Sequence, residues 1–197
     1  MKQPHQPGSE PDGHSVASPG RRAFFTRAAG VTAGLIGLAV AVPGRAHASP
    51  AAPAAGTAQS DWWFCQKCYT MFFHGYADNG RCPAGGAHSP QGYNFILPYG
   101  GAATPTAQSY WRFCPKCYSM HFEYYGPGPC PAGGGHIEQG FVFVLPHDIP
   151  ATLTSQSDWR FCQKCFVMFF YGYADNGHCA AGGAHSAQGF DFVLPHA

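Results

Sequence analysis

Hydrophobic and polar positions alternate in three separate stretches of the chain. Their apolar members are Tyr93/Phe95/Leu97, Phe141/Phe143/Leu145 and Phe190/Phe192/Leu194. A period of two is typical of a β-strand that buries one face. Each stretch ends at a proline, Pro98, Pro146 or Pro195, which does not fit the interior of a sheet. We therefore expect three half-buried strands at equivalent positions.

A second pattern precedes each of these strands. A Trp-x-Phe run leads into a Cys-x-x-Cys turn, and the chain leaves the turn through Met71, Met120 or Met168. Two short apolar runs around a tight turn predict a β-hairpin. Asp78-Asn79-Gly80 and Asp175-Asn176-Gly177 contain the Asn-Gly dipeptide that suits a type I′ turn. These patterns predict an all-β fold with three or four short strands per repeat and little helix.

The whole pattern occurs three times, beginning at Trp62, Trp111 and Trp159, with a period of 48 to 49 residues. A fixed period of this length indicates a repeat protein. Prolines and small polar residues between the copies indicate linkers. We divide this part of the chain into modules at 62–98, 111–146 and 159–197, preceded by linkers at 49–61, 99–110 and 147–158.

All nine cysteines lie inside the repeats, three in each, and a histidine follows each set after five intervening residues. The sets are Cys65, Cys68, Cys82, His88; Cys114, Cys117, Cys130, His136; and Cys162, Cys165, Cys179, His185. Two thiolates on one turn, completed by a distant Cys and His, suit a tetrahedral metal ion. The spacing predicts three small modules of the zinc-ribbon or zinc-knuckle type, with three zinc ions. Iron or copper(I) fits the same donors.

Disulfide bonding is the alternative reading of these cysteines. An exported chain meets oxidising conditions in which disulfides persist. Three cysteines per module do not pair within a module, however, and disulfides give the histidines no role. Four protein ligands also leave no open coordination position, so we expect structural rather than catalytic sites. His74, His121 and His178 fall in columns that other residue types fill in the other copies, and we do not expect them to be ligands.

Residues 1–48 are typical of a targeting segment with a disordered leader. Arg21 and Arg22 precede an uncharged run at 28–42, and Ala46 and Ala48 form a small-residue cleavage site. This arrangement resembles a twin-arginine signal peptide. The apolar run is too short to span a bilayer, so we expect secretion without a stable membrane anchor.

Charge excludes one class of partner. Five of the eleven basic residues precede Ser49, which leaves six basic and eight acidic residues in the remainder. A nucleic-acid-binding protein needs a basic surface to neutralise phosphates. The repeats have none, so we do not expect nucleic acid as a partner.

Aromatic residues make up 15% of the chain. One interpretation is that those in excess pack between modules and build a shared core. The other is an exposed platform that stacks on sugar rings or anchors a protein. The candidates for such a platform are Trp63, Tyr76, Tyr124, Tyr125 and Tyr173.

The motifs W-x-F-C-x-K-C-x-x-M and C-x-A-G-G-x-H-x-x-x-G-x-x-F-x-L-P cover Trp62 to Pro195. They resemble a Cys/His repeat of uncharacterised secreted proteins from actinobacteria and other bacteria. That resemblance implies the module type and an extracellular location, and it implies no activity.

These observations favour a secreted, non-enzymatic protein that binds an extracellular glycan or protein through repeated weak sites. The alternative is a protein that sequesters zinc or copper outside the cell. No combination of nucleophile, base and acid at useful spacing indicates an enzyme.

Overall fold

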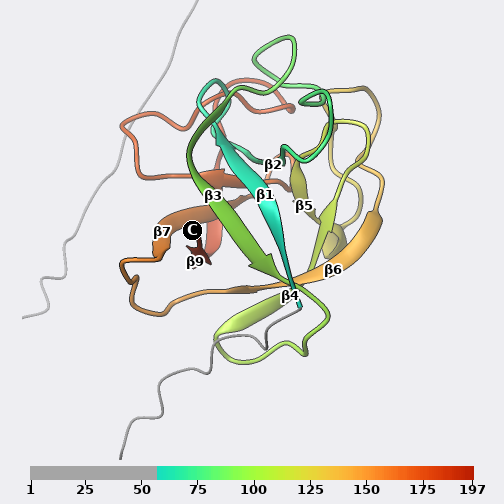
Figure 1. Ribbon diagram of the computed structural model, residues 1–197. Coiled ribbons are helices and arrows are strands. Elements are labelled where there is room, and N and C mark those ends of the chain that lie inside the picture. The colour runs from blue at the N-terminus through green and yellow to red at the C-terminus, as the bar shows by residue number, and fades with distance from the viewer. Residues whose placement is uncertain (1–56) are drawn as a thin grey trace, which may run out of the picture. The chain divides into compact units, whose positions relative to one another are not determined.

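Three small antiparallel sheets build the part of the chain that the structure describes, residues 57–197 of a computed structural model (Figure 1). The first contains β1 (Ala58–Cys65), β2 (Met71–Phe73) and β3 (Pro90–Pro98). The second contains β4 (Ala107–Phe113), β5 (Met120–Phe122) and β6 (Gln139–Pro146), with a short 3-10 helix η1 (Glu123–Tyr125). The third contains β7 (Ser155–Cys162), β8 (Met168–Phe170) and β9 (Ala187–Pro195). The predicted all-β fold with three strands per module is confirmed.

The predicted export segment and leader at 1–48 lie outside the described residues, as does the start of the first linker. No helix within residues 57–197 is long and apolar enough to cross a membrane.

In every sheet the long first strand lies between the other two strands. Its pairing with the short strand, Trp62 opposite Phe73 and Phe64 opposite Met71, is the predicted hairpin. The long strand begins before the tryptophan, in the stretch expected to be a linker, and it bulges there. Asp61, at the bulge, has a positive φ of 65°, and its amide donates to Asn94 Oδ1 at 2.8 Å.

The three modules share one hydrophobic core. Trp62, Trp111 and Trp159 are fully buried in a single cluster that contains residues of all three sheets. Each indole packs edge-on against an aromatic ring of another module, and the ring centroids lie 5.1 to 5.2 Å apart. The pairs are Trp62–Phe143, Trp111–Phe192 and Trp159–Phe95. The interpretation in which excess aromatic residues build an inter-module core is confirmed.

Backbone hydrogen bonds close the modules into a ring. The last residue of each short strand donates its amide to the residue that follows the second cysteine in another module. These bonds are Phe73 N to Tyr118 O (2.9 Å), Phe122 N to Phe166 O (2.8 Å) and Phe170 N to Tyr69 O (2.9 Å). They order the modules first to second, second to third and third to first.

The residues that follow the third strands repeat this order. Tyr99 pairs with Phe143, His147 with Phe192 and His196 with Phe95. The same residues stack on neighbouring rings with centroids 3.7 to 3.8 Å apart, in the pairs Tyr99–Phe141, His147–Phe190 and His196–Tyr93. The last module thereby closes onto the first, and Figure 1 shows β9 near the carboxyl end of the chain.

Where one copy of the repeat lacks an interface residue, its partner in the neighbouring copy is also changed. The hydroxyl of Tyr69 donates to Asp175 at 3.4 Å, and that of Tyr118 donates to Asp78 at 3.3 Å. The second module is one residue shorter in this loop and lacks the aspartate, and the residue that faces it is Phe166, which has no hydroxyl.

The predicted type I′ turns at Asp78-Asn79-Gly80 and Asp175-Asn176-Gly177 are wrong. Such a turn needs a positive φ at two successive residues. Only Gly80 and Gly177 have one (62° and 61°) among these residues. Glycine is needed at position 80 for a different reason: a Cβ there would lie 2.5 Å from Cys117 O in the neighbouring module. A hydrogen bond from the amide of His88 to Asn79 O, at 3.2 Å, holds the backbone of Asn79 in place.

Candidate metal centres

The hairpin turn places the first two cysteines of each set. In the first module, Cys65 ends β1 and Cys68 lies on the turn before β2. The amide of Tyr69 donates to Cys65 O at 2.8 Å, and the amide of Cys65 donates to Thr70 O at 3.0 Å. Tyr69 has a φ of 68°, which costs about 1–2 kcal/mol for a residue other than glycine. The inter-module bond to Tyr69 O helps to hold this conformation.

A glycine-rich loop places the other two residues of the set. Gly85 and Gly86 have φ angles of 97° and 65°, which bring Gly86 O to the amide of Cys82 at 2.8 Å. His88 follows this loop, two residues before β3 begins at Pro90. The loop therefore turns back on itself and presents Cys82 and His88 to the hairpin turn.

The structure brings together the four predicted residues of every module. In each group the ligand atoms lie within 4.8 Å of one another, and all four side chains are buried. The groups are Cys65, Cys68, Cys82, His88; Cys114, Cys117, Cys130, His136; and Cys162, Cys165, Cys179, His185. None of the nine cysteines forms a disulfide.

The distances within each group fit a tetrahedral ion. Zn–S bonds of about 2.3 Å and Zn–N bonds of about 2.05 Å give tetrahedral edges of about 3.8 Å between sulfurs and about 3.6 Å between sulfur and nitrogen. Cys65 Sγ and Cys82 Sγ lie 4.0 Å apart, and Cys68 Sγ lies 3.4 Å from His88 Nδ1. The third module gives 3.9 Å and 3.4 Å for the same pairs. A disulfide needs about 2.05 Å. The three groups can hold metal ions, and their geometry suits zinc.

Electrostatics favour a cation at this position. Hydrogen bonds from Cys68 and Cys82 hold the pKa of the Cys65 thiol far below its usual range, although burial opposes this. Burial, together with the neighbouring thiols, raises the pKa of Cys68. Burial alone would lower the pKa of His185, but hydrogen bonds to Cys162 and Cys179 raise it to about 9. Each group therefore stabilises one negative sulfur and retains protons that a divalent ion would replace.

The histidine of one site is oriented by the turn of another. His88 Nε2 lies 3.0 Å from Cys117 O, and His185 Nε2 lies 3.1 Å from Cys68 O. A carbonyl oxygen only accepts, so Nε2 carries a proton. Nδ1 is then the nitrogen that faces the sulfurs, and it can bind a metal ion once it has no proton of its own. Such a second hydrogen bond fixes the tautomer and orientation of a ligating imidazole. The coordination groups of different modules are thereby in direct contact.

The second module departs from this arrangement. His136 Nε2 is buried and has no hydrogen-bond partner among the described residues. His136 stacks on His121 with ring centroids 4.8 Å apart, where the other modules stack Phe72 on His88 and Phe169 on His185. Both nitrogens of His121 are also buried, with no hydrogen-bond partner in the part of the chain that the structure describes, and burial lowers its pKa to about 4. As predicted, His121 does not belong to the metal group.

Replacing His121 by phenylalanine is expected to stabilise the protein. The substitution removes two buried, unpaired polar atoms and keeps the stack on His136, so the free energy of unfolding is expected to rise by about 1–3 kcal/mol. Urea denaturation of the metal-loaded protein at neutral pH measures this change. The matched control is Phe72→His, which puts the same defect into the first module and is expected to destabilise it. A lower free energy of unfolding for His121→Phe would contradict the account.

Main-chain amides also point at the sulfurs. Ser89 N donates to Cys65 Sγ at 3.4 Å, and Ala181 N donates to Cys179 Sγ at 3.4 Å. The lysine between the paired cysteines donates a hydrogen bond to the glycine loop. In the first module, Lys67 Nζ donates to Gly85 O at 2.6 Å. Sequence reasoning missed Thr70, whose hydroxyl lies 3.1 Å from Cys68 Sγ.

The structure places the predicted platform residues in several different environments. Tyr76 and Tyr173 are half-exposed and lie at module interfaces, and Tyr125 has the equivalent position in the second module. Trp63 is partly buried and contacts His74, with ring centroids 5.8 Å apart. Tyr124 is exposed and lies against Tyr110 and Tyr125. Sequence reasoning also missed the interface glutamines, although Gln59, Gln108 and Gln156 occupy one column in all three copies.

The fold and the three buried clusters together define a Cys3His repeat protein. Comparisons with protein-family models, curated proteins and solved structures find no match to the chain.

Proposed function

We propose that the chain is an exported, non-enzymatic binding protein whose three metal-held modules present aromatic side chains to an extracellular glycan or protein. The observation that carries this proposal is the exposure of large aromatic groups on a scaffold whose core is already filled. Tyr76, Tyr124, Tyr125 and Tyr173 are 50–66% exposed. Exposed aromatic groups of this size are typical of binding surfaces.

The coordination groups support a structural role for the metal, which we propose to be zinc. Three thiolates and one imidazole complete a tetrahedron, so no position is left for water or substrate. Soft thiolates with an imidazole favour zinc, although iron and copper(I) accept the same donors.

Export is proposed from the sequence. Arg21 and Arg22, the uncharged run and the Ala46/Ala48 site support the twin-arginine route. That route carries folded chains, which would allow the thiolate sites to take up metal in the reducing cytoplasm before export.

The test is retention of partners by the immobilised, metal-loaded full chain. We expect it to bind a cell-wall glycan or a secreted protein, and we expect the metal-free, unfolded chain not to bind. Failure to retain any member of either class would remove the support for this function.

A second candidate function, sequestration of zinc or copper, is favoured by one observation. The third cysteines of all three modules, Cys82, Cys130 and Cys179, line one open depression of about 570 Å³. Such a depression is a route by which ions could leave or enter. Exchange against isotopically labelled zinc separates the two functions: complete exchange within minutes favours sequestration, and retention over days favours a structural metal.

A further inference from the structure

Two clefts of nearly the same composition lie at two of the module interfaces. The first, of about 210 Å³, is lined by Gln59, Phe73 and Tyr76 of the first module and by Phe113, Gln139 and Phe141 of the second. The second, of about 260 Å³, is lined by Gln156, Phe170 and Tyr173 of the third module and by Phe64, Gln91 and Tyr93 of the first. These residues occupy identical columns of the repeat. The ring order therefore builds the same cleft from different pairs of modules.

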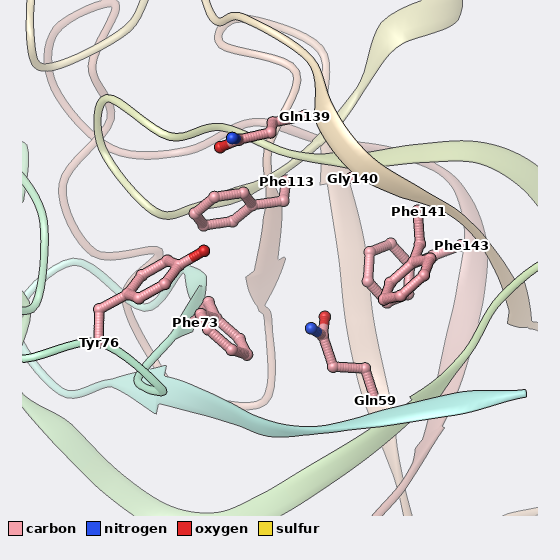
Figure 2. A pocket seen from close by; sticks show the side chains of 8 residues that line it. All are labelled: Gln59, Phe73, Tyr76, Phe113, Gln139, Gly140, Phe141 and Phe143. Atoms are coloured by element: carbon pink, nitrogen blue, oxygen red, sulfur yellow. The ribbon is translucent and has the colours of Figure 1, made fainter. Parts of the chain in front are cut away.

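The clefts combine aromatic rings with uncharged polar groups. Within residues 57–197, no charged side chain lines either of them. Phe113 forms the buried floor, whereas Tyr76 and Phe141 are 52% and 43% exposed. Figure 2 shows the Gln59 amide and the Tyr76 hydroxyl pointing into the space between the rings of Phe73, Phe113 and Phe141.

The orientation of the first glutamine is fixed by the core. The indole N–H of Trp62, which is fully buried, donates to Gln59 Oε1 at 3.1 Å. Trp159 holds Gln156 in the same way at 3.0 Å. Because the amide oxygen is engaged, the amide NH2 is the group left to donate hydrogen bonds to a ligand. A donor whose rotamer is already set costs little entropy when it binds.

The floor is rigid as well. Phe73 packs edge-on against Trp62, with centroids 5.4 Å apart, and Tyr76 packs against Phe113 at 5.9 Å. Gln139 lies opposite Phe113 in the register of β4 and β6. The polar and aromatic groups of the cleft therefore come from strands and a packed loop with defined geometry.

We infer that each cleft binds one pyranose ring of an uncharged polysaccharide, with the apolar C–H face of the sugar on the aromatic rings and its hydroxyls on the glutamine amides and the tyrosine. This inference rests on the proposed binding function and narrows its partner to a neutral glycan. The volumes lie below the ~300 Å³ at which sites for drug-sized ligands begin, which suits a single ring. Equivalent clefts on a ring of modules suit a polymer with a repeating unit, because weak sites then add by avidity.

The same lining fits a protein partner less well. The absence of charged groups removes the ion pairs that commonly fix a protein in register. The glutamine amides would also stay unpaired against an apolar side chain, which costs affinity.

The experiment measures the affinity of the metal-loaded full chain for a soluble neutral glucan, mannan and galactan, with methyl glycosides of the same sugars as competitors. At least one polysaccharide is expected to bind. Tyr76→Ala/Tyr125→Ala/Tyr173→Ala is expected to weaken this binding by at least about tenfold, because all the sites lose a ring at once. Tyr110→Asp is the matched control, since Tyr110 is an exposed tyrosine outside the clefts and the other modules have Asp61 and Asp158 in its column. It is expected to bind as the unmodified chain does.

A second variant tests the amides without removing aromatic surface. Gln91→Leu/Gln139→Leu/Gln188→Leu alters exposed positions only, and it is expected to lower the affinity by a similar factor. Far-UV circular dichroism checks that each variant folds. Absence of polysaccharide binding, or binding that both variants retain, would overturn the inference. A different result would be a secreted protein that binds the full chain and the leucine variant but not the tyrosine variant. That result would overturn the inference of a glycan ligand and leave the proposed binding function intact.

Discussion

Removal of the metal is expected to unfold all three modules in one step. Each hairpin turn meets its glycine loop at the Cys3His group, with a lysine contact such as Lys67 Nζ to Gly85 O beside it. A structural zinc supplies about 10–16 kcal/mol of apparent binding free energy. Loss of all three ions therefore removes more free energy than the net stability of a typical domain, which is about 5–15 kcal/mol. Titration with a chelator, followed by far-UV circular dichroism, measures the result. An unchanged spectrum after complete removal of metal would contradict a structural role.

Native mass spectrometry with elemental analysis supplies the control for this prediction. Three ions and nine unmodified cysteines are expected before chelation. During the titration, folded species with one or two ions are expected to be scarce, because the sites are in contact through His88 and Cys117 and through His185 and Cys68. Mass losses that indicate oxidised cysteines in a metal-free, folded protein would instead identify a disulfide protein.

Much of each module follows from local sequence. Alternation at Phe95 and Leu97 predicts a strand with one buried face, and both residues are buried in β3. The repeated spacing of Cys65, Cys68, Cys82 and His88 predicts the group that the structure assembles. These predictions succeed because the ligand spacing and the strand period are properties of a single repeat.

The closed ring does not follow from local sequence, because it depends on contacts between modules. Asn79-Gly80 is the clearest case: the dipeptide suits a hairpin turn, yet the glycine is needed for close approach to Cys117 O in the next module. The positive φ of Tyr69 is likewise held by a bond from the third module. One signal was available in the sequence, since Phe166 replaces tyrosine in one copy and the aspartate facing that position is missing in another.

Loss of a single ligand is expected to destabilise the whole ring rather than one module. Cys130→Ser removes one ligand from the second site without altering the turn at Cys117, and we expect a loss of at least about 4 kcal/mol in the free energy of unfolding. Trp111 packs on Phe192 of the third module, and Phe143 packs on Trp62 of the first. If the second module unfolds, the first and third modules therefore each lose an aromatic contact in the core. Cys82→Ser and Cys179→Ser are expected to give similar losses, because the same kind of Trp–Phe contact links every module to its neighbours in the core.

The indole groups report on each module separately. The N–H groups of Trp62, Trp111 and Trp159 donate to Gln59, Gln108 and Gln156, so each gives an NMR signal that depends on its own sheet. In Cys130→Ser, we expect all three signals to disappear at the same urea concentration, which is lower than for the unmodified chain. If the indole signal of Trp111 disappeared first while those of Trp62 and Trp159 stayed native, the modules would unfold independently of one another. The shared core argues for the first outcome, because a module that unfolds alone would expose the rings of both neighbours to water.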